Sequence, residues 1–356
     1  MAFFPFTYNP ERSIEVNDVT NTYFKNNKEI AEKIETWAWI YHGLHDAIPT
    51  TMENLWSGHQ FPFRESWEEL QISCTLCQFG LYKQAMCSLR SVLELGLLSV
   101  YYNINDLGHE TVKKWLASKN SNDANTPRFS DVWKILIAHP NIEKFQDKID
   151  IKQRLMDLGY LHNYVHTKGQ KFSNQIGLFK TNTQSFETIG LENWLVAFQE
   201  VILLVVTLHL LKYPTSMIDY DYSLKFGIDV PAFPHMRQGN LRKINDEFPE
   251  AIIKAIQKIS DEDEEVKDFK EWIDSHEDMT AEDVENQIVN MDKREIERQG
   301  FVSYIRNQLA LYRAKSVETL IPAVKDRVEK LEIWARKNNH YEDKFPNLHK
   351  KANNNI

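Results

Sequence analysis

The sequence is poor in the residues that build cross-linked or turn-rich folds. Its 356 residues include 3 cysteines, 12 glycines and 12 prolines. An odd number of cysteines without a regular spacing argues against a disulfide framework and fits a reducing compartment. Scarce glycine and proline leave few turn positions, which favours long helices over many short strands. We therefore expect a predominantly helical protein.

The sequence also lacks a long apolar run. Its most apolar stretch, VILLVVTLHLL at 201–211, is shorter than the roughly 20 residues that a membrane-spanning helix needs. Glu200 precedes this stretch and His209 lies inside it, so we interpret it as a buried core helix. The first residues show neither the basic segment nor the continuous apolar segment of a secretory signal. We expect a cytoplasmic protein with no membrane partner.

The net charge of −9 lacks the overall basic excess of a dedicated nucleic-acid-binding domain. The charge is unevenly distributed, because residues 246–300 hold 19 Asp/Glu and 7 Lys/Arg, whereas residues 301–356 hold 6 and 11. The acidic segment is a poor surface for RNA on Coulomb grounds. Any RNA partner should instead touch Arg154, Lys168, Lys171 or the basic C-terminal helix.

Apolar residues recur every three or four positions along most of the chain, which is the pattern of one buried helix face. Residues 27–48 form such a segment, whereas the first 23 residues read as an irregular aromatic arm. Residues 61–80 and 81–103 predict two helices that meet at a tight turn and form an antiparallel hairpin, with Ser66 as the N-cap of the first. The fold class expected is therefore all-α, an antiparallel helical bundle.

A stretch rich in Pro, Tyr and Phe at 213–248 interrupts the helical pattern. A structureless segment of this length is uncommon inside a compact domain, so we place a domain boundary there. The predicted organisation is an N-terminal helical domain at 1–225, a linker at 226–250, and a second, smaller helical region at 251–356 that is first acidic and then basic.

Two charged residues stand out in the helix predicted at 81–103. Arg90 and Glu94 are four residues apart, so they share a helix face and can pair. The residues around them are apolar on almost every side, and a charge pair in such a helix is costly unless it is satisfied. Two interpretations stay open: an ion pair within the helix at the domain edge, or an Arg90 that reaches a phosphate, a carboxylate or His166.

Two histidines, His162 and His166, lie on one face at the end of a helix predicted at 148–166. Such a pair can bind a metal, but Asn163 stands where a metalloprotease helix has Glu, and no third ligand is obvious nearby, although His42, His45 and Asp46 are possible partners. A histidine could alternatively act as a general acid or base. The remaining interpretation is a helix C-terminus, which suits a histidine and a following glycine.

Signals for a cofactor are weak. Cys74 and Cys77 have zinc-knuckle spacing, but a structural zinc site needs four ligands, and Cys87 is the only other cysteine. We interpret all three as core thiols. The sequence contains no phosphate loop, nucleotide-binding glycine fingerprint or nucleophile elbow. We predict no metal and no cofactor.

One family resemblance emerges from residues already named. The helix with Tyr82, Ala85, Arg90 and Glu94, followed later by a helix that ends in Tyr164, Val165 and His166, resembles HEPN-like helical proteins over residues 64–214. These include uncharacterised bacterial and phage-defence-associated proteins. The resemblance implies a HEPN-like bundle and a homodimer formed through helix faces. HEPN ribonucleases carry an Arg a few residues before the His, and that linear motif is absent here.

Two functional hypotheses follow. The first is a helical interaction or accessory protein of a bacterial defence or toxin-type system, with a protein partner bound through the C-terminal region. The second is a metal-independent HEPN-like ribonuclease or nucleotide-processing enzyme. Its catalytic candidates are His166, Arg90 and Glu94, and its substrate-binding candidates are His162, Asn163, Arg154 and Lys168.

Overall fold

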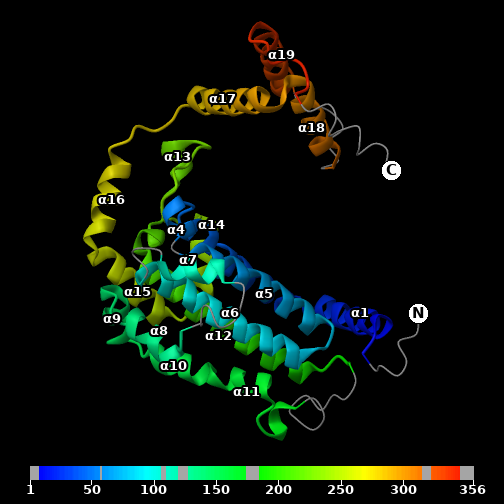
Figure 1. Ribbon diagram of the computed structural model, residues 1–356, viewed down its shortest axis with the longest axis vertical. Coiled ribbons are helices and arrows are strands. Elements are labelled where there is room, and N and C mark those ends of the chain that lie inside the picture. Colours follow the sequence, from blue (N-terminus) through cyan, green and yellow to red (C-terminus); the bar gives the residue numbers. More distant parts are fainter. Residues whose placement is uncertain are drawn as a thin grey trace. The chain divides into compact units, whose positions relative to one another are not determined.

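The computed structural model describes residues 8–56, 58–105, 110–118, 127–173, 184–314 and 322–344. Every regular element in these ranges is helical, which confirms the all-α prediction (Figure 1). By contacts, the chain forms two compact units. The first unit comprises Met1–Tyr220 and Ala232–Trp272, and the second comprises Asp221–Pro231 and Ile273–Ile356.

The helices follow the chain in this order: α1 (Pro10–Asn26), α2 (Lys28–His42), α3 (Leu44–Ala47), α4 (Met52–Trp56), α5 (Gln60–Gln78), α6 (Tyr82–Asn105), α7 (Glu110–Ala117), α8 (Phe129–Leu136), α9 (Pro140–Gln146), α10 (Ile151–Asp157), η1 (Leu158–Tyr160), α11 (Leu161–His166), η2 (Gln170–Phe172), α12 (Thr188–Lys212), η3 (Pro214–Met217), α13 (Tyr222–Phe226), α14 (Gln238–Glu247), α15 (Glu250–Glu262), α16 (Glu264–Asp274), α17 (Ala281–Gln299), α18 (Phe301–Ala314) and α19 (Pro322–Lys337).

The centre of the first unit is the hairpin of α5 and α6, with α12 beside α6 (Figure 1). Two buried serines join the hairpin: Ser73 Oγ donates to Ala85 O at 2.8 Å, and Ser66 Oγ donates to Val92 O at 2.9 Å. These bonds confirm the antiparallel hairpin. The N-cap predicted at Ser66 is wrong, because α5 begins at Gln60 and the Ser66 hydroxyl serves the neighbouring helix instead.

Helix α12 is the most apolar element of the first unit. Its length and mean hydropathy of 2.0 would suit a membrane span, but 78% of its most apolar window is buried inside the protein. This burial is compatible with a soluble protein and with the core helix that the sequence predicted. It packs tightly on α6, where a Cβ on Gly96 would lie 2.7 Å from both Val205 methyl carbons. Glycine at this position therefore lets the two helices touch.

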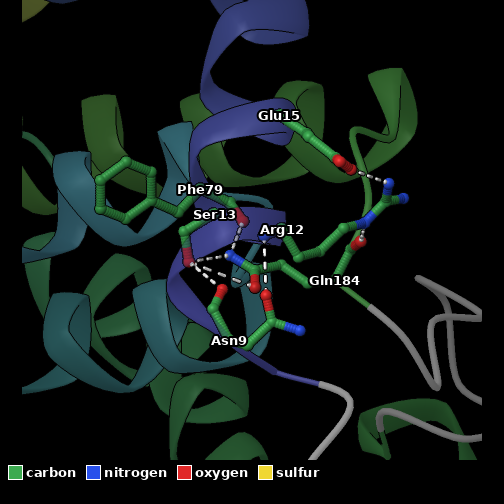
Figure 2. Close-up of polar contacts among 6 residues, drawn as sticks. All are labelled: Asn9, Arg12, Ser13, Glu15, Phe79 and Gln184. Carbon is green, nitrogen blue, oxygen red and sulfur yellow. Dashed lines mark hydrogen bonds and ion pairs between the residues drawn. The ribbon is translucent and has the colours of Figure 1, made fainter. Parts of the chain in front are cut away.

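From Pro10 onward the N-terminal segment is a helix and not the irregular arm that we expected, whereas residues 1–7 of that arm lie outside the described residues. Asn9 caps α1, Pro10 occupies its first turn, and its inner face is held by the buried amide of Gln184 (Figure 2). The Gln184 amide nitrogen donates to Phe79 O at 2.7 Å and to Ser13 Oγ at 3.0 Å. Arg12 Nε donates to the Gln184 carbonyl at 2.7 Å. A partner far along the chain thus fixes a helix whose local pattern is weak.

The unit boundary also differs from the linker expected at 226–250. Helices α14 and α15 bury their apolar faces in the core of the first unit. Phe248, between them, stacks on Trp37 at 5.3 Å, and Trp37 Nε1 donates to Glu247 at 2.8 Å. Phe248 is therefore a packing residue of the first unit. The segment around it is not the linker that its Pro-, Tyr- and Phe-rich composition suggested. Helix α13 belongs to the second unit.

The second unit has a small core of its own. Its buried residues are Ile296, Phe301, Tyr304, Leu331 and Ala335, contributed by α17, α18 and α19. Thr280 and Asp283 form a capping box at the start of α17. The sequence predicted a second helical region from residue 251. The second unit instead begins its main part at Ile273 and also includes Asp221–Pro231, which contains α13.

Two fully buried histidines meet between α5, α6 and α12. His209 Nδ1 contacts Val205 O at 2.8 Å, and its Nε2 lies 3.2 Å from Ser99 Oγ, which donates to His59 O. The rings of His59 and His209 are 5.4 Å apart. Desolvation lowers the pKa of His209 to about 4, and it lowers the pKa of His59 as well, with the nearby His209 and Lys212 adding to the effect.

We expect acid to destabilise the fold through this pair. In the unfolded chain a histidine titrates near 6.5, so the unfolded state binds more protons than the folded state below that pH. The stability is fully present above about pH 6.5 and is lost as the pH falls toward the folded-state value. His209 alone should account for about 2 kcal/mol at about pH 5. Urea unfolding of His209→Gln should show a shallower loss with pH than wild type, and equal slopes for the two proteins would contradict this role of His209.

The α6–α12 contact gives a second test. Gly96→Ala should lower the free energy of unfolding by about 1–3 kcal/mol, because the added methyl group overlaps Val205. Gly239→Ala in α14 is the matched control, since its Cβ meets no atom within 4 Å. Equal unfolding free energies for the two variants would contradict a tight α6–α12 contact.

Candidate functional site

A cavity of about 700 Å³, here called the cleft, lies in the first unit along α6. Its other walls come from the start of α8 and from the segment α10–η1–α11. Most of the lining is aliphatic, and four charged or titratable side chains interrupt it. The described lining residues are Arg90, Leu93, Glu94, Leu97, Leu98, Pro127, Arg128, Phe129, Val132, Leu155, Met156, Leu158, Gly159, Leu161 and His162.

Arg90 and Glu94 lie on the wall of the cleft that α6 provides. Arg90 Nε and Nη2 both donate to Glu94 Oε1, at 2.9 and 2.7 Å. The two side chains are 25% and 54% exposed, so the pair is open to water and stabilises the helix by only about 0.3–0.5 kcal/mol. The helix is buried on its other sides, as predicted. The structure thus shows the ion pair within the helix, at the mouth of a cavity.

The histidine segment is the end of a short helix. Helix α11 ends at His166, and Thr167 follows in the left-handed conformation with φ of 47°. Lys168 N donates to Asn163 O at 3.0 Å, and Lys83 Nζ donates to Thr167 Oγ1 at 2.7 Å. The helix-end interpretation is therefore confirmed. The residue in the left-handed conformation directly after the helix is a threonine and not the glycine that we expected.

His162 lines the cleft, whereas His166 lies outside the lining and contacts the His162 ring. Their ring centroids are 4.2 Å apart. The pKa of His162 is lowered, first by desolvation and then by the positive charges of Arg90, His166 and Lys168, while Glu94 opposes this shift. His162 is therefore neutral at pH 7 and can accept or donate a hydrogen bond at the cleft.

The other candidate residues lie outside the cleft. His166 and Lys168 are exposed, and among the described residues no hydrogen bond joins His166 to Arg90 or Glu94. Arg154 makes a bidentate ion pair with Glu200 of α12: its Nε donates to Oε1 at 2.7 Å and its Nη2 to Oε2 at 2.9 Å. Asn163 is half-buried. The structure thus groups Arg90, Glu94 and His162 at one cavity and leaves His166 in contact with His162.

No known protein family matches this chain, and no curated protein and no solved structure matches it either. The HEPN-like resemblance accordingly stays a prediction. Function has to be argued from the cleft itself.

The sequence did not single out the aliphatic lining or Arg128. Arg128 is exposed at the start of α8. The apolar residues around Arg90 and Glu94 on α6 were interpreted as buried. The sequence held one signal for the cleft. Arg90, Glu94 and Leu97 lie on a single stripe of the helix, so charged and apolar side chains share that helix face.

The described residues do not assemble a metal-binding group of three or more His, Cys, Asp or Glu side chains. Burial raises the pKa of the Cys74 thiol to about 12 and raises the pKa of the Cys77 thiol well above its ordinary value, so both thiols are protonated. The histidines at 42 and 45 are engaged with Trp67 and Phe63. The chemistry that the cleft can offer is apolar burial, the guanidinium groups of Arg90 and Arg128, the carboxylate of Glu94 and one neutral imidazole.

Proposed function

We propose that the chain is a helical binding protein whose cleft takes a small ligand with an apolar body and an anionic group. The observation that carries this proposal is a 700 Å³ cavity with a mainly aliphatic lining and a few converging polar side chains. Small-molecule sites commonly have volumes of about 300–1,000 Å³ and this division between apolar walls and polar groups.

The cationic side of the cleft supports an anionic ligand group. Both bonded nitrogens of Arg90 contact the same oxygen of Glu94, and among the described residues Arg90 Nη1 has no hydrogen-bond partner. An arginine has five N–H donors, so an anion can bind beside the existing pair. The accessory role expected from the sequence fits the same proposal, since ligand binding to such a module can change its affinity for a protein partner.

Filling the cleft should abolish binding. An anionic naphthalene sulfonate probe should bind wild type at one site per chain, and Leu97→Trp should weaken binding at least about tenfold because the indole occupies the cavity. The matched control is Val196→Trp, on an exposed position of α12. Fluorescence titration measures the affinity, and circular dichroism checks folding.

If Leu97→Trp does not fold, Gly159→Trp replaces it. Gly159 lines the cleft, and its Cβ would meet no atom within 4 Å, so a large side chain there does not overpack the core. Equal probe affinity in both cleft variants and wild type would contradict the proposal.

A second candidate is the metal-independent ribonuclease or nucleotide-processing enzyme suggested by the resemblance. The contact between His162 and His166 beside Arg90 and Lys168 favours it, because an acid–base group with nearby cations suits phosphodiester chemistry. In-line transfer with two histidines would need them on opposite sides of a phosphate, and rings 4.2 Å apart leave no such space. One histidine would therefore act alone.

Cleavage of RNA in the presence of a chelator tests this candidate. His162→Ala and His166→Ala should each reduce cleavage at least about a hundredfold if that histidine is the acid–base group. Arg242→Met, an exposed change on α14, controls for the general loss of a charge. Cleavage that survives in both histidine variants would end the ribonuclease proposal.

A further inference from the structure

We infer that the ligand of the cleft is an aliphatic monoanion: a free, single-chain molecule whose hydrocarbon part lies along α6 and whose anionic end binds at Arg90. This inference rests on the proposed binding function and names the chemical class of its ligand.

The lining of the cleft excludes a polar ligand body. Seven of the described lining residues are leucine or valine, and the aromatic rings among them are those of Phe129 and His162. A nucleobase or a sugar buried against such a surface would leave its donors and acceptors without partners, which costs about 1–3 kcal/mol for each group. A hydrocarbon chain has no such groups. The polar atoms of the ligand therefore belong at its end and not in its body.

The cleft follows α6 for more than two turns. Its lining on that helix runs from Arg90 to Leu98, which corresponds to about 12 Å at the helical rise per residue. The anion-binding guanidinium is at one end of this stretch, and Leu97 and Leu98 are at the other. An extended chain with a single charged end matches this distribution.

The charges of the lining fit one negative charge. Arg90 and Arg128 are cationic, Glu94 is anionic, and His162 is neutral at pH 7, so the lining carries one net positive charge. Glu94 is 54% exposed, so its carboxylate stays in contact with water while an anion binds beside the pair at Arg90 Nη1. A polyphosphate would bring several negative charges to two arginines.

A homologous series of alkyl sulfonates tests the inference. These anions stay charged across the working pH range, and calorimetry below their micelle concentrations measures the affinity. Each added methylene should raise affinity about fourfold until the chain outgrows the cleft. Alkyltrimethylammonium ions of equal chain length and adenosine monophosphate should bind at least about tenfold more weakly than the matching sulfonate.

Variants separate the two ends of the ligand. Arg90→Met should weaken binding of octanesulfonate about tenfold or more and leave the increase per methylene unchanged, because it removes the anion contact alone. The matched control Arg242→Met should bind like wild type. Leu97→Trp should shorten the chain length at which affinity stops rising.

Each outcome supports or overturns the inference. Affinity that does not change with chain length, or equal binding of alkylammonium and alkylsulfonate, overturns the aliphatic monoanion. If the naphthalene probe binds in a way that Leu97→Trp abolishes but alkyl sulfonates do not bind, the binding function stands and the ligand class is wrong. If neither binds, both proposals fail. Co-flotation with anionic phospholipid vesicles, without binding of free alkyl sulfonate, would replace the free ligand by a membrane lipid.

Discussion

The close contact between α6 and α12 is the constraint on which the rest of the first unit depends. Gly96 has no side chain, so the backbone of α6 can rest on Val205. With that side of α6 covered, the helical rotation of about 100° per residue places Arg90, Glu94 and Leu97 about 100–160° around the helix from Gly96. α5 covers another part of the helix. The cleft forms where α8 and the α10–α11 segment approach the remaining face without closing on it.

Buried polar groups give this packing its register. Ser66, Ser73 and Ser99 each donate to a carbonyl outside their own helix, and Gln184 links the segment before α12 to α1 and to the turn after α5. A buried hydroxyl or amide without a partner is costly, so helices that slide by one residue lose these bonds together. Burial lowers the pKa values of His59 and His209, so we expect acid to weaken the packing around this pair.

Local patterns predicted some parts of this structure well and misled on others. The α5–α6 hairpin, the core position of α12 and the helix end at His166 follow from apolar spacing and from turn and cap signals close in sequence. The N-terminal arm and the linker were misjudged because their order comes from distant partners: Gln184 for α1, and Trp37 for the segment around Phe248. In the site, i,i+4 spacing revealed the Arg90–Glu94 pair, whereas Arg128 gave no local signal.

The sequence by itself determined the helical class, the ion pair within α6 and the contact of His162 with His166, because residues three or four apart on a helix are neighbours whatever surrounds them. The tertiary structure alone decided which face of α6 stays uncovered. That choice depends on α8, α11 and α12, which lie far apart in the chain and compete for the same apolar helix. It is also what placed His162, and not His166, at the cleft with Arg90.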